Sequence, residues 1–256
     1  MPSSPDDAHM AMLGAQFADL SAALTSKDDS GLDPHRVVRF ATRSIPNTEH
    51  CGLTLLRPGH APRTMTTTGE LPQRVDELQY AVHEGPCLDA SETDMVAITG
   101  DLDKDERWPV FGPRCAQETG VQSMLSVRLV LAADDQAAIN FYSQGRDAFT
   151  ELDIGIASIF APYAALAVEQ ALREQDAANF HDALSSSRQI GTAIGIIMAR
   201  KLVTSDEAFD ILRQASQDLN RKLRDIAAEV QETGAVPTTA SKGAAASVSD
   251  GGRLGG

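Results

Sequence analysis

The spacing of apolar residues changes at Thr150, and this change limits the folds open to the chain. Before Thr150, short stretches such as residues 51–56 alternate between buried-type and polar side chains, and a Pro-Gly turn signal follows. After Thr150, apolar residues recur at steps of three and four as far as Val230. The chain therefore predicts an α+β part followed by an all-helical part.

The first part predicts an antiparallel sheet flanked by helices, with about five strands. Strand signals fall at residues 51–56, 63–68, 95–99, 123–131 and 137–142. Helical spacing or helix-start signals fall at residues 10–24, from Asp33-Pro34 onward, at 72–82 and at 108–119.

The second part predicts a connecting helix from Thr150 to about residue 175, and a helix at 179–199 that is separate from it or continuous with it. Pro162 should kink or open the first of these helices. A near-heptad seam predicts coiled-coil pairing and is made of Ile156, Ile159, Tyr163, Leu166 and Gln170.

Two shorter helices should follow. Thr204-Ser-Asp-Glu207 is a capping box, and the helix after it is expected to bury Ala208, Phe209, Leu212 and Ala215. Asp218 is expected to cap the last helix, which Gly234 and Pro237 end. The predicted organisation is a disordered segment at 1–9, an α+β domain with its linker helix at 10–170, a three-helix unit at 176–236 and a disordered tail at 237–256.

The chain is acidic, with 22 Lys and Arg against 36 Asp and Glu and a net charge of −14. Such a chain repels nucleic acid unless its cations are gathered in one place. Residues 188–224 hold seven cations and four acidic residues, so the charge is locally reversed. This excess predicts an anion-binding surface, with a solvated helix face as the plain alternative.

Other function classes find little support. The N-terminus lacks the features of a signal peptide, and the most apolar window, 155–168, is too short to span a bilayer, so a soluble cytoplasmic protein is expected. Cys51, Cys87 and Cys115 form no C-x-x-C pair and are expected to be reduced thiols without a metal. No nucleotide-binding or hydrolase motif occurs, so neither an enzyme nor a cofactor is predicted.

Residues 188–231 closely resemble an ANTAR domain, the RNA-binding module of bacterial transcription antiterminators. The resemblance lies in Arg188, Gly195-Ile196, Met198, Ala208-Phe209, Leu212-Arg213, the run 220–223 and the run 225–227, although Ile194 stands where that family usually has Lys. It implies binding to hairpin RNA, often to paired stem-loops. Asn and Arg side chains suit recognition of loop bases. The predicted RNA-binding residues are Arg188, Arg200, Lys201, Arg213, Asn220, Arg221, Lys222 and Arg224.

Residues 12–170 look like the GAF domain found in front of ANTAR in actinobacterial-type regulators. The similar runs are 76–80, 84–90, 107–109 and 120–123. The resemblance implies a six-stranded antiparallel sheet with flanking helices, often dimeric through terminal helices. If the domain binds a ligand, the candidates are Tyr80, Glu84, Cys87 and Trp108, although a structural turn at 84–87 and simple packing of Trp108 are the favoured interpretations of those residues.

The predicted function is therefore an RNA-binding transcription antiterminator whose GAF-like domain senses a signal or dimerises. Its expected partners are hairpin RNA, a second copy of the chain, and a small molecule or an upstream signalling protein, but not a membrane. One alternative is a signalling platform for a protein partner, with the helical unit used only for dimerisation. Another is a sulfoxide reductase that uses its cysteines as nucleophile and resolver.

Overall fold

The computed structural model describes residues 33–238 except 58–59, 93–94 and 133–134, together with residues 11, 14, 15 and 18. Most of the expected helix at 10–24 lies outside these residues, as do segment 1–9 and the tail beyond residue 238. The chain divides into two compact units, and the division falls between Glu174 and Gln175.

A five-stranded antiparallel sheet forms the centre of the N-terminal unit, in the strand order β2-β1-β5-β4-β3. Five strands were expected from the sequence, and the sixth implied by the family resemblance is absent from the described residues. Leu53 and Val127 both pair with Ile139, so three apolar side chains lie in one row across the middle of the sheet. The strands are β1 (His50–Leu56), β2 (Arg63–Thr67), β3 (Val96–Thr99), β4 (Ser123–Val130) and β5 (Gln136–Ser143).

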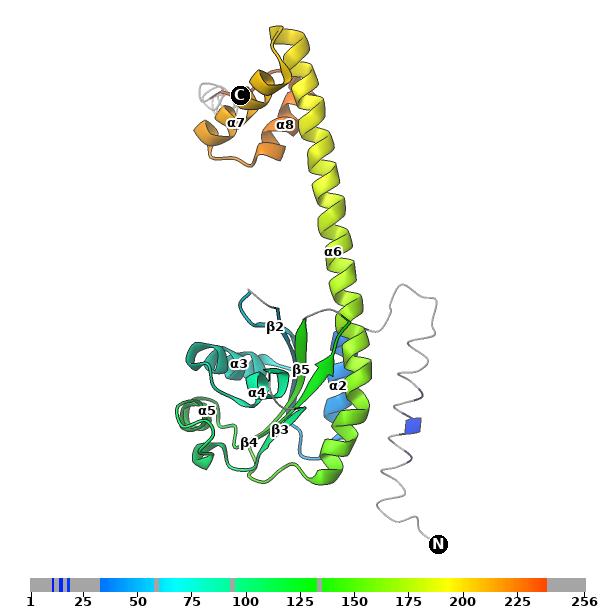
Figure 1. Ribbon diagram of the computed structural model, residues 1–256, viewed down its shortest axis with the longest axis vertical. Helices are drawn as coiled ribbons and strands as arrows, with labels where there is room; N and C mark the ends of the chain where they lie inside the picture. The colour runs from blue at the N-terminus through cyan, green and yellow to red at the C-terminus, as the bar shows by residue number, and fades with distance from the viewer. Residues whose placement is uncertain are drawn as a thin grey trace, which may run out of the picture. The chain divides into compact units, whose positions relative to one another are not determined.

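Helices cover both faces of this sheet. Figure 1 shows α3, α4 and α5 on one face, and α2 with the first part of α6 on the other. The sequence did not predict α4, because its Gly-Pro start resembles a turn. The bounds are α2 (Pro34–Ser44), α3 (Glu70–Val82), α4 (Pro86–Glu92), the 3-10 helix η1 (Leu102–Lys104), α5 (Phe111–Thr119) and α6 (Glu151–Lys201).

The two faces of the sheet carry two separate cores, because successive side chains of a strand point to opposite sides. On β1, Cys51 and Leu53 point into the core shared with α2 and α6, where Phe160 is fully buried. The opposite core gathers around Trp108, which precedes α5, and includes Val75 of α3 and Phe111 of α5. Thr54 belongs to this second side, since it bonds to a residue of α3.

Helix α6 is one unbroken helix, so the two helices expected at 150–175 and 179–199 are continuous. Thr150 and Asp153 bond to each other at its start, where the Asp153 carboxylate accepts from the Thr150 N–H (2.8 Å). The expected opening at Pro162 does not occur. Because proline has no N–H, Pro162 leaves the Ser158 carbonyl without its helical donor. Both residues lie on the exposed side of the helix, where water can bond to that carbonyl.

By length and composition, α6 passes the test for a membrane-spanning helix, with an 18-residue window of mean hydropathy 1.4. The 14-residue window seen in the sequence therefore underestimated the apolar run. The window is 44% buried. Phe160, Ala164 and Val168 pack against the sheet, as apolar residues do in the core helix of a soluble domain.

The C-terminal unit is a small helical cluster made of the last part of α6, α7 (Ser205–Leu219) and α8 (Leu223–Thr233). The predicted capping box is confirmed: the Thr204 N–H donates to Glu207 Oε2 (2.8 Å), and the Glu207 N–H donates to Thr204 Oγ1 (3.4 Å). Gly234 ends α8 in the left-handed conformation, as expected. The shared core is formed by Ala193, Ile197, Ala208, Leu212, Ala215, Ile226, Ala227 and Val230.

Two expectations about this unit are wrong. Asp218 does not cap the last helix: Asn220 ends α7 with a φ of 49°, and Lys222 occupies the N-cap of α8. Asn suits this position because it tolerates the left-handed region better than most residues. Phe209, expected in the core, is 39% exposed.

Candidate functional site

Half of the predicted RNA-binding set serves local structure in the C-terminal unit. Three arginines form ion pairs there, Arg213 with Asp210 (2.8 Å), Arg221 with Glu229 (2.6 Å) and Arg224 with Asp225 (3.7 Å). The Arg221 carbonyl also accepts a hydrogen bond from Ser216 Oγ at 2.6 Å. Arg221 and Asn220 therefore hold the turn between α7 and α8 in shape.

The other four cations of the set are unpaired. Arg188, Arg200, Lys201 and Lys222 are exposed and form no ion pair within the described part of the chain. Arg200 and Lys201 end α6, where positive charge complements the helix dipole. The Arg200 guanidinium lies against Gly234, so a side chain at that glycine would collide with it. Among the predicted RNA-binding residues, these four cations are the ones that remain available to an anion in the described part of this unit.

Two further features of the unit were missed by sequence reasoning. Phe209 exposes an aromatic face on α7, four residues before Arg213, although its helical spacing predicted burial. An apolar groove of about 550 Å³ lies between the end of α6, α7 and the segment after α8. The groove needs the tertiary fold to exist, because its walls come from three separate stretches of chain.

In the N-terminal unit, the most unusual group is a carboxyl buried between the sheet and α3. Asp76 is fully buried and accepts hydrogen bonds from three hydroxyls. Thr54 and Thr64 donate to its Oδ2 at 3.1 and 2.6 Å, and Tyr142 donates to its Oδ1 at 2.8 Å. Three separate strands, β1, β2 and β5, thus supply donors to one residue of α3.

Burial raises the pKa of Asp76 to about 6, because a charged carboxylate loses its hydration there. The hydroxyls of Thr64, Tyr142 and Thr54 work in the opposite direction, since they donate to the carboxylate. The Tyr80 hydroxyl acts in the same direction. The pKa of this carboxyl therefore reflects burial, partly offset by the hydroxyl groups that donate to it.

The network continues toward the start of α4. Gln79 donates to Asp76 Oδ1 (3.4 Å) and accepts from the Cys87 N–H (3.0 Å), while Asn140 Nδ2 donates to Thr54 Oγ1 (3.1 Å). Gly85 is required beside Gln79, since its φ is 141° and a Cβ there would lie 2.2 Å from Gln79 Oε1. The Asn140 Oδ1 atom is buried and has no hydrogen-bond partner among the residues that the structure describes.

The four predicted ligand residues are not gathered in one site. Tyr80 and Cys87 adjoin the Asp76 network: the Tyr80 hydroxyl lies 3.4 Å from Thr64 Oγ1, and Cys87 Sγ accepts from Asn140 Nδ2 at 3.3 Å. Glu84 instead accepts hydrogen bonds at the start of α5, from the backbone N–H groups of Val110 (2.9 Å) and Phe111 (3.0 Å). Its carboxylate therefore caps that helix.

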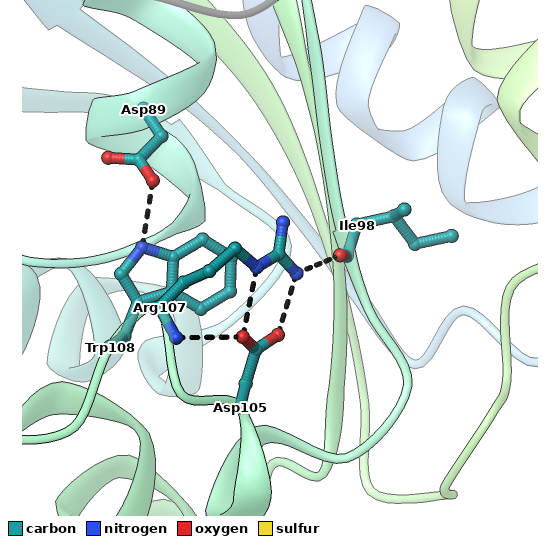
Figure 2. Close-up of polar contacts among 5 residues, drawn as sticks. All are labelled: Asp89, Ile98, Asp105, Arg107 and Trp108. Carbon is teal, nitrogen blue, oxygen red and sulfur yellow. Dashed lines mark hydrogen bonds and ion pairs between the residues drawn. The ribbon is translucent and has the colours of Figure 1, made fainter.

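Trp108 is 1% exposed, and its contacts are internal. Figure 2 shows its indole N–H donating to Asp89 Oδ2 (2.9 Å), with the Arg107 guanidinium over the ring at 4.3 Å from the centroid. Arg107 is itself held by Asp105 (Nε to Oδ1, 2.9 Å) and by the Ile98 carbonyl (2.6 Å). This cluster joins α4, β3 and the loop before α5.

The three cysteines are free, buried and unsuited to ready thiol chemistry. Burial raises the pKa of Cys51, and it raises the pKa of Cys87 and of Cys115 to about 12, so thiolate is scarce at neutral pH. Cys51 belongs to the core on one face of the sheet and Cys115 to the core on the other. Among the described residues, no group of His, Cys, Asp or Glu has the arrangement of a metal site.

Comparison with known proteins agrees with this architecture. Residues 32–169 match the family model described as GAF domain, and residues 178–230 match the model described as ANTAR domain. The chain therefore belongs to the GAF domain family and carries an ANTAR domain behind the GAF domain. No curated protein matches the chain in sequence.

Solved structures resemble the N-terminal unit at low identity. The GAF domain of a phosphoenolpyruvate-protein phosphotransferase from Coxiella burnetii is 14% identical with a TM-score of 0.50, covering 68% of this chain and 99% of that one. The corresponding Acinetobacter GAF domain is 12% identical with a TM-score of 0.45 (66% and 97% covered). The free methionine-R-sulfoxide reductase of Neisseria meningitidis, solved with its substrate, is 13% identical with a TM-score of 0.44 (66% and 96% covered).

The first of these likenesses supports the α+β fold of the N-terminal unit and nothing about its ligand. The domain composition carries the functional meaning. An ANTAR domain implies RNA binding in antitermination control, and a GAF domain implies signal sensing. Together they indicate a regulatory protein rather than a catalytic one, built from domains that are typically soluble.

Proposed function

We propose that this chain is a homodimeric, cytoplasmic transcription antiterminator of the actinobacterial type, in which the ANTAR unit binds paired RNA hairpins. The GAF domain receives the signal, from a small molecule or an upstream protein, and thereby sets the RNA affinity of the dimer. Neither part is an enzyme, and no cofactor takes part. The RNA contacts come from the cations of the C-terminal unit and from Asn220.

One observation carries the proposal. In a chain with a net charge of −14, the ANTAR unit keeps Arg188, Arg200, Lys201 and Lys222 exposed and unpaired with any acid of the described residues. Unpaired cations on one small unit of an otherwise acidic protein are typical of a surface that binds an anion. Phosphate contacts of this kind supply sequence-independent affinity, to which Phe209 and Asn220 can add base contacts.

Dimerisation is supported by an exposed apolar row on α6. Ile159 and Leu166 are 51% and 49% exposed and lie seven residues apart, while their neighbour Ile156 is buried in the GAF core. Only part of the predicted heptad seam is thus free to face a second copy. Two RNA-binding units on one dimer gain affinity for tandem hairpins through effective concentration.

The test is binding of the full chain to a library of tandem hairpin RNAs with a common stem and randomised loops, measured by fluorescence anisotropy over a range of salt. Wild type should bind selected hairpins. The variants Arg188→Ala and Lys222→Ala should each lower the log–log salt slope by roughly 1, because each removes about one phosphate contact.

Arg213→Ala is the matched control, since the structure pairs Arg213 with Asp210 and its removal should change the slope less. Tandem hairpins should also bind more tightly than single ones. Absence of binding to every hairpin at low salt would contradict the proposal. Equal slopes for wild type, Arg188→Ala and Lys222→Ala would show that these cations do not contact RNA.

A protein platform is the second candidate, favoured by an apolar groove of about 510 Å³ in the GAF domain. Met95 and Val130 on its rim are 58% and 70% exposed. Exposed apolar side chains gathered at a groove are typical of protein-binding surfaces. This candidate would be favoured if the protein bound no RNA but still formed a dimer and bound a protein partner. The reductase alternative has least support, because the sheet separates Cys51 from Cys115 and all three thiols are buried.

A further inference from the structure

The ANTAR unit contains a groove that its helix core does not explain. Its floor is apolar and comes from α6, α7 and the segment that follows α8. The volume is about 550 Å³, enough for one nucleotide. The floor residues are Ile197, Ile211, Ala215, Leu219, Val236 and Pro237.

The rim of the groove is polar and asymmetric. Arg200 and Lys201 stand at the α6 end, and neither forms an ion pair within the described residues. Gln214 and Asp218 stand on α7, where Gln214 Nε2 donates to Asp218 Oδ1 at 2.7 Å. An apolar floor therefore lies between a pair of cations and a carboxylate–amide pair.

We propose that this groove takes one unpaired nucleobase of the hairpin loop, with the adjoining phosphate held by Arg200 and Lys201. The inference rests on the proposed RNA-binding function and adds how a loop base is recognised. The apolar floor contacts the face of the base, which every base offers. Phosphate pairs with the two cations at the rim.

The carboxylate at the rim limits which base fits. Asp218 accepts hydrogen bonds and cannot donate them when ionised, so it needs a donor on the edge of the base. Adenine, cytosine and guanine carry an exocyclic amino group. Uracil carries none, and the single donor on its pairing edge, N3–H, lies between two carbonyl oxygens that a carboxylate repels. The groove should therefore prefer an amino-bearing base over uracil, with Gln214 adjusting to the neighbouring edge atom.

Charge also argues against the chain's own tail as occupant. Residues 239–256, which follow the groove-lining Thr238 in the sequence, contain only two large apolar residues, Val248 and Leu254. Their charged side chains are Lys242, Asp250 and Arg253, a net charge of +1, so the segment does not offer the negative charge that Arg200 and Lys201 would attract. An anionic chain with flat apolar groups matches this rim better than a Gly- and Ala-rich segment with almost no net charge.

The experiment uses the full chain and one hairpin RNA selected by wild type from the randomised-loop library, with each loop nucleotide in turn made abasic. Ala235→Phe fills the groove from an exposed position, and Asp218→Asn changes its rim. Gln217→Phe adds the same aromatic ring on α7 outside the groove and serves as the control. Far-UV circular dichroism and thermal unfolding confirm that each variant is folded.

At one loop position, the abasic change should weaken wild-type binding by about 10- to 100-fold. Ala235→Phe should bind the intact loop more weakly than wild type by a similar factor. On the abasic RNA, Ala235→Phe and wild type should bind with the same affinity. Gln217→Phe should bind both RNAs as wild type does. Asp218→Asn should reduce the preference for an amino-bearing base over uracil at the same position.

Three results overturn the inference. If Ala235→Phe binds the intact and abasic RNAs as wild type does, no base enters the groove. A changed sedimentation coefficient of this variant would then indicate that the groove is a protein interface. If Ala235→Phe weakens every RNA by one common factor, the groove acts without a base. If truncation after residue 238 raises the RNA affinity of the wild-type protein but not that of Ala235→Phe, the tail occupies the groove. Absence of any hairpin binding by wild type would instead refute the proposed function itself.

Discussion

The buried carboxyl of Asp76 makes a prediction about stability that is independent of RNA. Folding raises its pKa from 3.8 to about 6, so the folded state binds this proton more tightly than the unfolded state does. Its contribution to the free energy of unfolding is then full at pH values below 3.8 and is lost as the pH rises through 6. The full contribution is about 3 kcal/mol, because one pKa unit corresponds to about 1.4 kcal/mol.

The perturbation is Asp76→Asn, which keeps the size of the side chain and removes the titration. Asn alters the hydrogen bonds to Thr54 and Thr64, and this cost does not depend on pH. The stability advantage of wild type over Asp76→Asn should fall by roughly 1 kcal/mol between pH 5 and pH 7.5, the part of the linkage curve that lies in this range.

The assay is urea unfolding followed by tryptophan fluorescence. Trp108 is the one tryptophan of the chain, and its burial in the GAF core makes the signal specific to the N-terminal unit. Measurements stay above the isoelectric point, near pH 4.7, to limit association. Glu77→Gln, which replaces an exposed carboxyl next to Asp76 on α3, is the control. Parallel stability curves for wild type and Asp76→Asn across this range would refute the reasoning.

Three other predictions concern separate parts of the chain. Thr204→Ala should lower the stability of the C-terminal unit by about 1 kcal/mol, because the Glu207 N–H loses the Thr204 Oγ1 acceptor of the capping box; thermal unfolding measures this, and an unchanged midpoint would contradict it. The three buried thiols should resist a thiol reagent at pH 8 in the folded protein and react fully in urea, so one fast-reacting thiol in the native state would count against their burial. The double variant Ile159→Asp/Leu166→Asp should have half the wild-type mass in sedimentation, and Ser158→Asp should keep the wild-type mass. Equal masses for wild type and both variants would show that the dimer contact lies elsewhere.

Local signals predicted most elements of the fold, and the wrong predictions occur where tertiary packing decides the local structure. Strands at 51–56 and 123–131 follow from alternation, and the capping box at Thr204 is a contact between residues three apart. The turn after α7 was misjudged, because Asp218 and Asn220 are both plausible helix-end residues by type. The backbone conformation that selects Asn220 at φ 49° is decided by how α7 and α8 pack together.

The candidate site was predictable in part. Charge counting located the cations of the C-terminal unit, but their pairing depends on distances across the fold. Arg221 meets Glu229 eight residues later, and no local rule anticipates that bond. Phe209 shows the reverse case, since its spacing predicts burial and the small size of the unit leaves it exposed.

The sequence by itself determined the two-part organisation, the family resemblances and the reversal of charge near the C-terminus, because periodicity, motif spacing and composition are properties of the chain. Only the tertiary structure decided which charges are free, that Glu84 caps α5 and Trp108 bonds to Asp89, and that Asp76 is buried beneath hydroxyls of three strands. Each of these depends on residues far apart in sequence meeting at hydrogen-bond distance. Burial and distance, unlike residue type, exist only once the chain has folded.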